Sequence, residues 1–307
     1  MSKIKYFFVI VFWFAIVFVL IHNCFSALRE YNSGLKGKRN LVQIIDVEKK
    51  TNIIVLGDTG TGASEQYKVA DAVAALCMRI ECTAVFIAGD VIYPDGVASL
   101  SDDEFKTKFE LPYQEIELPF YIAFGNHDYL GCTQCYLDYA SKSTKWMMPS
   151  AYYKVSLDKT DYFVIDTESF TDAQQSWLKT GLQDSEANWK VVLGHKPLQT
   201  YDVTHFTEDW DGKDELKEII CSSTDVHISG HAHLLEYFEK IEGCSVNQIV
   251  SGGGGADPRP NVPNLEETFV YSGYGFVLIS SNSDSFEITY YSNTGEELYK
   301  DRLNNKN

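Results

Sequence analysis

Short apolar runs that end at or just before a glycine recur along the chain between residues 52 and 230. Five such runs are rich in β-branched and aromatic side chains, a composition typical of buried strands. They occupy residues 52–56, 83–87, 119–124, 189–193 and 225–229. After the first run, residues 64–79 place Val69, Val73 and Leu76 on one stripe, which predicts an amphipathic helix. Strands that alternate with helices predict an α/β fold.

The later part of the chain adds helices and then turns to strands alone. Ser101 with Glu104 has the spacing of a helix-capping pair, and so has Thr171 with Gln174, whose helix should run to about Gln183. The other predicted elements are a helix at 213–221, a hairpin of 152–157 and 162–166, and strands at 235–241, 246–250, 275–280, 285–291 and 297–303. Together these patterns predict two packed mixed sheets with helices outside, a four-layer α/β/β/α sandwich.

The glycine after each of the five apolar runs is followed at once by a side chain that can bind a metal ion. Such a glycine and aspartate after a strand often form a plain turn, but five occurrences make chance a poor explanation. The carboxyl ends of strands in open α/β sheets are also where ligands bind, so we expect these side chains to meet. Tyr93 and His233 lie two or three residues after such a side chain and can also bind a metal ion. The candidate ligands are therefore Asp58, Asp90, Tyr93, Asn126, His195, His231 and His233.

The ligand types indicate which ions such a site would take. Hard oxygen donors mixed with imidazoles suit iron, zinc or manganese rather than a soft thiolate-binding metal. Seven ligands are too many for one ion with an open position, whereas two ions that share the Asp90 carboxylate fit. Such a pair activates a water molecule and clamps the attacking and leaving oxygens of a phosphoryl centre.

These motifs resemble those of the metallophosphoesterases, and Tyr93 is the mark of the purple acid phosphatases. The motifs are Gly57-Asp58-Thr59-Gly60, Gly89-Asp90-Val91-Ile92-Tyr93, Gly125-Asn126-His127-Asp128, Gly194-His195 and Gly230-His231-Ala232-His233. The resemblance to the tartrate-resistant (type 5) branch of this calcineurin-like family runs from about Ile53 to Leu303. It includes residues 175–178 and 251–254, the latter expected to be an active-site loop with close backbone approach.

The resemblance implies an exported acid phosphatase that hydrolyses phosphate monoesters by attack of a metal-bound hydroxide at a dinuclear centre. It implies a ferric ion on Asp58, Asp90, Tyr93 and His233. It implies a second, divalent ion (Fe(II), Zn or Mn) on Asp90, Asn126, His195 and His231. Two readings remain as alternatives: another metallophosphoesterase, such as a phosphodiesterase or nucleotidase, and a membrane-tethered, non-catalytic scaffold on the same fold.

Three further histidines are sorted by their positions. The resemblance implies that His127 holds the substrate phosphate and helps to protonate the leaving alkoxide. His205, ten residues after His195, is close to where the branch has a second acid–base histidine, and a surface histidine is the alternative. His227 alternates away from the ligands within its strand and is expected in the core.

Two departures from the mammalian members of the branch affect specificity and regulation. Tyr129 stands where those members have a histidine after the Gly-Asn-His-Asp motif, which leaves the preferred substrate open. Those members also carry a long protease-sensitive loop after the hairpin, whereas only residues 168–170 separate Thr167 from Thr171 here. The repressive role of that loop should therefore be absent.

Charge limits the classes of partner. The formal net charge of −17 over 307 residues argues against a nucleic-acid partner, which would favour a basic surface. The same charge opposes a phosphate substrate at long range, so any attraction must come from cations bound at the site. We expect a monomer that acts on small-molecule phosphomonoesters or phosphoproteins.

The N-terminal segment indicates export. Lys3 and Lys5 precede sixteen uncharged residues, 6–21, that would span about 24 Å as a helix. That length lies between a signal peptide and a membrane anchor, so residues 1–26 are a signal peptide or signal anchor, with cleavage slightly favoured. Residues 27–50 are a polar linker, and 51–304 form the phosphatase-like domain. The domain should be secreted or extracytoplasmic, and bound to a membrane only if the segment stays uncleaved.

Cysteine usage agrees with export. Apart from Cys24, the chain has six cysteines, an even number that suggests disulfides outside the cytoplasm. One of the fifteen possible connectivities pairs local neighbours: Cys77 with Cys82, Cys132 with Cys135, and Cys221 with Cys244. The Cys132–Cys135 spacing also fits half a zinc site or a redox motif, and both alternatives stay open.

Overall fold

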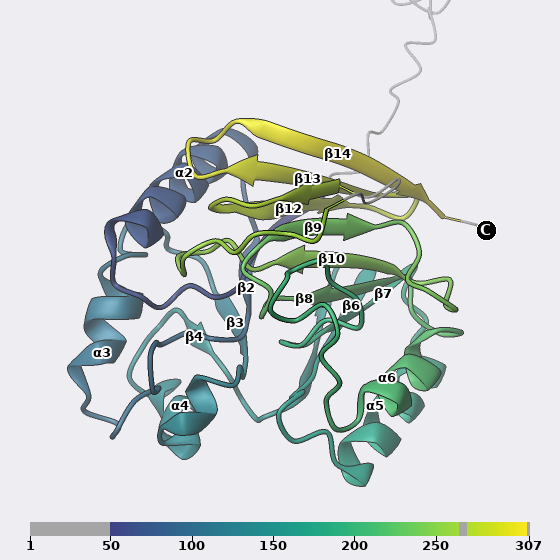
Figure 1. Ribbon diagram of the computed structural model, residues 1–307, viewed down its shortest axis with the longest axis horizontal. Helices are drawn as coiled ribbons and strands as arrows, with labels where there is room; N and C mark the ends of the chain where they lie inside the picture. The colour runs from purple at the N-terminus through teal and green to yellow at the C-terminus, as the bar shows by residue number, and fades with distance from the viewer. Residues whose placement is uncertain (1–49, 264–268, 306–307) are drawn as a thin grey trace, which may run out of the picture. The chain divides into compact units, whose positions relative to one another are not determined.

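Two seven-stranded sheets form the centre of the fold (Figure 1). The computed structural model of the chain describes residues 50–263 and 269–305. The first sheet, in spatial order, contains β14 (Glu297–Asn304), β13 (Ser285–Ser292), β12 (Gly275–Ser281), β1 (Thr51–Leu56), β2 (Ala84–Ala88), β3 (Phe120–Ala123) and β4 (Trp146–Met147). The second contains β11 (Phe269–Tyr271), β9 (Leu235–Phe238), β10 (Asn247–Ser251), β8 (Val226–Ser229), β7 (Trp189–Leu193), β6 (Thr160–Val164) and β5 (Tyr153–Leu157).

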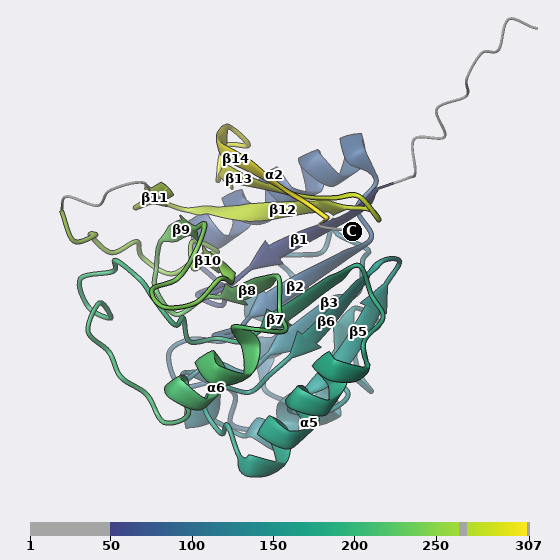
Figure 2. The same ribbon diagram turned by 90° about the vertical axis from the view of Figure 1, so that its right-hand side faces the viewer.

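Helices cover the outer face of each sheet. The helices are α2 (Ser64–Ile80), α3 (Asp103–Phe105), a π-helical turn (Lys106–Glu110), a 3₁₀ turn (Asp128–Leu130), α4 (Thr133–Tyr139), α5 (Asp172–Asp184) and α6 (Lys213–Ile220). Figures 1 and 2 show α2 against the first sheet and α5 with α6 against the second. The predicted pair of mixed sheets with helices outside is therefore confirmed.

Both sheets combine parallel and antiparallel pairs, and this topology decides where the strands end. β1, β2 and β3 run parallel to one another, while β12 pairs with β1 in the antiparallel sense. In the second sheet β6, β7, β8 and β10 run parallel. The carboxyl ends of parallel neighbours lie at one edge, so each sheet delivers its strand-end residues to a single place.

Alternate side chains of the central strands serve two hydrophobic cores. In β6, Tyr162 and Val164 belong to the core between the sheets, whereas Phe163 faces the core under α5 and α6. Leu178 of α5 and Leu216 of α6 are fully buried in that second core. Successive side chains of a strand point to opposite faces of the sheet. When both faces are covered, all of these side chains are buried, which explains the continuous apolar runs in the sequence.

Most predicted elements are present, with differences in detail. The helix near residue 101 is capped by Asp102, whose carboxylate accepts a hydrogen bond from the backbone N–H of Glu104 at 3.0 Å, so the predicted Ser101 cap is wrong. Thr171 caps α5 as predicted, since its hydroxyl accepts from the N–H of Gln174. The elements that the sequence did not predict are α4, β4, β11 and the 3₁₀ turn at Asp128–Leu130, which have two to seven residues.

The predicted targeting segment and most of the linker, residues 1–49, lie outside the described residues. Among the helices of residues 50–263 and 269–305, none is both long and apolar enough to cross a membrane.

Three disulfides connect the pairs predicted as local neighbours. Cys77–Cys82 closes the end of α2, Cys132–Cys135 lies at the start of α4, and Cys221–Cys244 joins the end of α6 to the turn after β9. The Cys132–Cys135 disulfide replaces the half zinc site as the interpretation of that pair. Disulfides are typical of proteins that fold in an oxidising compartment.

The disulfide that spans the longest stretch of chain should contribute most to stability. Cys221 and Cys244 are 23 positions apart, whereas Cys132 and Cys135 are three apart. Because a disulfide stabilises largely by restricting the unfolded chain, we expect Cys221→Ser with Cys244→Ser to lower the free energy of unfolding by roughly 3 kcal/mol. The matched pair Cys132→Ser with Cys135→Ser should cost about 2 kcal/mol. Denaturant unfolding measures both, and a reversed order would contradict this ranking.

Candidate metal centre

The ends of strands from both sheets carry the seven predicted ligands to one place. Asp58 follows β1, Asp90 and Tyr93 follow β2, and Asn126 lies just after β3. From the second sheet, His195 follows β7, and His231 and His233 lie between β8 and β9. Hydrogen-bond distances between their polar atoms link the side chains into two adjacent groups.

The first group consists of Asp58, Tyr93 and His233. The phenolic oxygen of Tyr93 lies 3.0 Å from Asp58 Oδ1 and 3.2 Å from His233 Nε2. His233 Nε2 is in turn 3.5 Å from Asp58 Oδ1. A cation with bonds of about 2.1 Å places neighbouring ligand atoms roughly 3.0–3.4 Å apart. The spacing in this group therefore fits three ligands of one ion.

The second group contains Asn126, His195 and His231, with Asp90 at its edge. Asn126 Oδ1 lies 2.9 Å from His231 Nδ1 and 3.1 Å from His195 Nε2. The two ring nitrogens are 3.2 Å apart, and His195 Nε2 is 3.4 Å from Asp90 Oδ1. These spacings also fit ligands of one ion. Asp90 stands between the groups, since its side chain also lies within hydrogen-bonding reach of Tyr93 in the first group.

The hydrogen bonds on the far sides of the rings show which nitrogens can bind a metal. His195 Nδ1 donates to the carbonyl of Ala88 at 2.7 Å, and His233 Nδ1 donates to the carbonyl of Asp257 at 2.9 Å. His231 Nε2 donates to the Glu208 carboxylate at 2.8 Å. In each neutral ring, the nitrogen that faces the site then carries a lone pair. The facing nitrogens of His195, His231 and His233 are therefore available as ligands for a cation.

The electrostatics of the site favour positive charge at its centre. Burial raises the pKa of Asp58 well above its usual range, and burial with the Asp58 charge raises the pKa of Tyr93. Burial opposes a charge on His195, but the neighbouring Asp90 carboxylate outweighs it and raises the pKa of His195 to about 10. Burial lowers the pKa of His231 to about 4. A metal ion bound here would displace protons from these groups.

Two glycines of the motifs are required by the close approach of a neighbouring ligand. A Cβ at Gly125 would lie 2.2 Å from Asp90 Oδ1. Gly89 has φ +82°, and a Cβ there would lie 2.4 Å from the His195 ring. Any larger residue at either position would push a ligand out of the site. Glycine is therefore required before these ligands because the strand ends pack too closely for a Cβ atom.

Three of the predicted ligands have a backbone conformation that is rare for their residue types. Asp58, Asp90 and His231 have φ values of 57°, 52° and 67°. Non-glycine residues in the left-handed region cluster at functional sites, where the surrounding structure imposes the conformation. Part of that support for Asp58 comes from the N–H of His231, which donates to Asp58 Oδ2 at 2.8 Å.

The glycine-rich segment after β10 packs its backbone against the first ligand loop, as predicted. The N–H of Gly254 donates to the carbonyl of Gly57 at 3.0 Å, and the N–H of Ala256 donates to the carbonyl of Asp58 at 2.8 Å. This segment therefore holds the turn that carries Asp58. A close backbone approach of this kind leaves no room for side chains.

Asp128 is a site residue whose role the sequence did not reveal. Its side chain is fully buried, and Oδ1 accepts from the N–H groups of Val91 at 3.0 Å and Ile92 at 3.2 Å. Oδ2 accepts from the N–H of Gly125 at 2.9 Å. The carboxylate thus ties the loop of Asp90 to the loop of Asn126. Its place two residues after Asn126 was the only signal in the sequence.

The two predicted acid–base histidines differ in how their nitrogens are engaged. His127 Nδ1 is bonded to the carbonyl of Pro94, and its Nε2 lies on the Asp90 side of a ring that is 30% exposed. His205 has both ring nitrogens occupied, Nδ1 by Glu208 and Nε2 by Arg259. His227, by contrast, is fully buried and bonded to Gln248, which confirms its place in the core.

Two residues beside His205 were not predicted from the sequence. Glu208 contacts both His205 and His231, and Arg259 contacts both His205 and the carbonyl of His231 at 3.3 Å. Neither belongs to a recognisable motif. Both lie on irregular segments, so only their spatial position reveals them.

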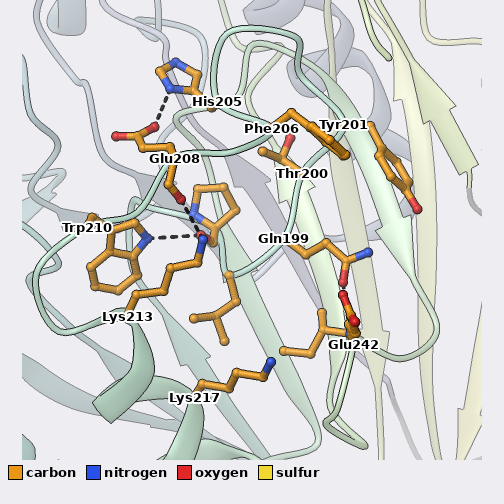
Figure 3. A pocket seen from close by; sticks show the side chains of 13 residues that line it. Gln199, Thr200, Tyr201, His205, Phe206, Glu208, Trp210, Lys213, Lys217 and Glu242 are labelled. Atoms are coloured by element: carbon orange, nitrogen blue, oxygen red, sulfur yellow. Dashed lines mark hydrogen bonds and ion pairs between the residues drawn. The ribbon is translucent and has the colours of Figure 1, made fainter. Parts of the chain in front are cut away.

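The segment that carries Glu208 also borders a cavity of about 440 Å³ (Figure 3). Phe206, Lys213 and Lys217 line it, together with His205 and Glu208 at its edge. None of the seven predicted ligands lines this cavity, so it adjoins the metal groups only through His205 and Glu208.

The departures at Tyr129 and at the short loop are visible in the structure. Tyr129 is 37% exposed and donates a hydrogen bond to Asp166 Oδ2 at 2.6 Å. Between β6 and α5 the chain needs only residues 165–171, with Thr171 already capping the helix. No long loop intervenes in this part of the described chain.

Known proteins resemble this chain over most of its length. Residues 51–235 match the sequence model of the calcineurin-like phosphoesterases. Purple acid phosphatase 4 of Arabidopsis thaliana is 25% identical over 282 residues, which cover 81% of this chain and 82% of the relative. Tartrate-resistant acid phosphatase type 5 of Homo sapiens is 27% identical over 257 residues, which cover 70% and 77%.

Among solved structures, GAP50, described as the anchor in the inner membrane complex of Plasmodium, has a TM-score of 0.74. It is 21% identical, and the match covers 85% of this chain and 90% of that one. At this identity the likeness shows a common fold.

We predict that Asp128→Asn destabilises the protein. The asparagine side chain has one oxygen, so it can accept hydrogen bonds only in place of one of the two carboxylate oxygens. Its NH₂ group would stand in place of the other oxygen and face a backbone N–H, which is also a donor. A buried donor left unsatisfied costs about 1–3 kcal/mol, and we expect that loss in the free energy of unfolding. Asp138→Asn, at an exposed position on α4, is the control and should change little. Equal unfolding midpoints for the two variants would refute this role for Asp128.

Proposed function

The chain belongs to the calcineurin-like phosphoesterase family, and from this premise we propose that it is an exported acid phosphatase with a dinuclear metal centre. Its similarity to purple acid phosphatases over most of the chain makes it a phosphoric monoester hydrolase. The observation that carries the proposal is the convergence of Asn126 Oδ1, His195 Nε2 and His231 Nδ1 within 3.2 Å of one another. Asn126 Oδ1 is an acceptor, and the far-side hydrogen bonds to Ala88 and Glu208 leave a lone pair on each facing ring nitrogen of a neutral imidazole, so all three atoms could hold one cation.

The residues present fit two ions that share Asp90. The first would be held by Asp58, Asp90, Tyr93 and His233. The second would be held by Asp90, Asn126, His195 and His231. Tyr93 favours a trivalent ion such as Fe(III) at the first position because a phenolate is a hard, anionic donor, and Fe(II), Zn or Mn suit the second. When bound, the ions would activate a water molecule and neutralise the phosphoryl oxygens.

His127 is the best-placed residue to act on the substrate. Its Nδ1 bond to the Pro94 carbonyl orients the ring, and the Tyr93 ring packs against it with centroids 4.4 Å apart. The Nε2 atom lies 4.0 Å from Asp90 Oδ2, beside the ligand groups, in a ring that is 30% exposed. From there it can hold the phosphate and donate a proton to the leaving alkoxide.

His205 is the second acid–base candidate, and it would act differently. Its ring lies 4.0 Å from that of His231, beside the second group of ligands. Because Arg259 donates to its Nε2, the ring could serve the substrate only after Arg259 has moved to the substrate phosphate. We therefore assign His205 a smaller contribution than His127.

Export is supported by the disulfides and by the N-terminal residues. Three disulfides are typical of an extracytoplasmic protein. Residues 1–26 supply the signal, and they would tether the domain to a membrane if uncleaved. The phosphodiesterase and scaffold alternatives are less favoured, since a scaffold has no need for seven converging ligands.

The purified protein tests this function directly. We expect about two metal ions per chain, one of them iron, a purple colour, and hydrolysis of p-nitrophenyl phosphate with an acidic optimum. Bis-p-nitrophenyl phosphate, a diester, should be a much poorer substrate. A metal-free protein without phosphatase activity would overturn the proposal in favour of the scaffold, and preference for the diester would favour a phosphodiesterase.

We predict that His127→Ala lowers kcat by about 10²–10⁴, the range expected when general acid–base help is lost. Both ions should remain bound, because His127 lies outside the ligand groups. Its backbone N–H, which donates to Asp90 Oδ1 at 2.9 Å, is kept in the variant, and its ring Nε2 lies 4.0 Å from Asp90 Oδ2. His205→Ala should lower kcat less. Steady-state kinetics with metal analysis measures all three proteins. Normal turnover in His127→Ala would exclude the assigned role.

A second prediction concerns Tyr93→Phe. Burial and Asp58 raise the pKa of the phenol, so only a strongly charged cation can deprotonate it. The phenylalanine variant should therefore lose the visible charge-transfer band and retain iron poorly. The ligands of the second ion should be unaffected, so its zinc or manganese content should persist. A variant with unchanged colour and full iron content would contradict a Tyr93 ligand.

A further inference from the structure

Glu208 is held in place by its own loop and by the start of α6. Its N–H donates to the carbonyl of His205 at 3.0 Å, and its carbonyl accepts from Lys213 Nζ at 2.7 Å. Trp210, largely buried, anchors the same segment by donating from Nε1 to the carbonyl of Pro197 at 3.2 Å (Figure 3). The backbone beneath Glu208 is therefore fixed on both sides.

The side chain of Glu208 joins two histidines of the site through one oxygen atom. Oε2 accepts from His231 Nε2 at 2.8 Å and also from His205 Nδ1. On the opposite edge of the His231 ring, Nδ1 faces Asn126 and His195. A ring with a carboxylate at Nε2 has a defined tautomer, with the proton on Nε2 and the lone pair of Nδ1 towards the ligand group.

We propose that Glu208 is a positioning residue for the second metal ion, which it serves by orienting the His231 ring and fixing its tautomer. The inference rests on the proposed function, because it assumes an ion among Asp90, Asn126, His195 and His231. A carboxylate that accepts from the far nitrogen of a ligating histidine orients the ring and increases its basicity. Removing such a partner typically weakens metal binding about 10–100-fold.

The same carboxylate couples the second ion to His205. Arg259 holds the other ring nitrogen of His205 and donates to Asp202 Oδ2 at 3.3 Å, while that oxygen accepts from the N–H of His233 at 3.2 Å. His205 is thus fixed between Glu208 and Arg259. Loss of Glu208 should release His205 and the His231 ring together, whereas the first group of ligands keeps its contacts.

A different role for the cluster is a third metal site. Oxygen and nitrogen atoms of His205, Glu208 and His231 lie within 4.8 Å of one another, close enough for one ion. Two observations oppose it. His231 would have to bind metal through both nitrogens and lose its last ring proton, and the Arg259 guanidinium, in contact with His205, would repel a cation.

The test uses the holoenzyme with iron in the first site and zinc in the second, dialysed against graded concentrations of a chelator. We expect Glu208→Ala to bind zinc about 10–100-fold more weakly while its iron content and colour stay unchanged. Glu208→Gln should bind zinc more tightly than Glu208→Ala, since one amide oxygen can accept both hydrogen bonds. Asp209→Asn, which removes the next, exposed carboxylate, should match the wild type.

The outcomes separate the inference from the function on which it rests. Wild-type zinc affinity in Glu208→Ala would overturn the inference and leave the phosphatase proposal standing. If the wild type holds a third ion and the variant loses it, Glu208 is a ligand of a third metal site and not a positioning residue. Parallel loss of iron and zinc would mean a general structural role. If the wild type binds no second ion, both the proposed dinuclear phosphatase and the role inferred for Glu208 are wrong.

Discussion

The structure depends on a convergence of hydrogen-bonding and ligand atoms at a place where positive charge is favourable. Asn126, His195 and His231 bring three acceptor atoms to within 3.2 Å of one another, and carboxylates stand beside them. Burial opposes a charge on His195, but the Asp90 carboxylate outweighs burial and raises the pKa of His195 to about 10, so the site favours positive charge. The fold must hold these atoms close together, and much of its architecture serves that end.

Rigid strand ends meet this requirement. The parallel strands of two sheets deliver their carboxyl ends to one place, and glycines such as Gly125 let neighbouring loops approach to atomic contact. Asp58 and His231 accept unfavourable backbone conformations. Asp128, fully buried, ties two ligand loops together through backbone N–H groups. The strained backbone conformations cost stability, and the Asp128 hydrogen bonds restrict the loops. Both features serve to fix the positions of the ligands.

The loop that carries Glu208 shows how a second layer supports the ligands. His231 depends on this carboxylate for its tautomer, as His195 depends on the carbonyl of Ala88 and His233 on that of Asp257. The two carbonyls belong to the backbone and cannot be lost by substitution. Glu208 is the one side chain among these three partners, which makes it the point where metal binding can be adjusted.

The sequence by itself determined most of the strands, the main helices and the seven candidate ligands, because these follow from local patterns: apolar runs, capping residues and short spacings. It offered the local disulfide pairing as one of several possible connectivities, and the structure contains that pairing. The sequence did not determine α4, the cap at Asp102, or the roles of Asp128, Glu208 and Arg259. The roles of Asp128, Glu208 and Arg259 depend on contacts between positions 23 to 54 apart in the sequence. Only the tertiary structure decides such contacts, since hydrogen bonds between irregular segments leave no periodic trace in a sequence.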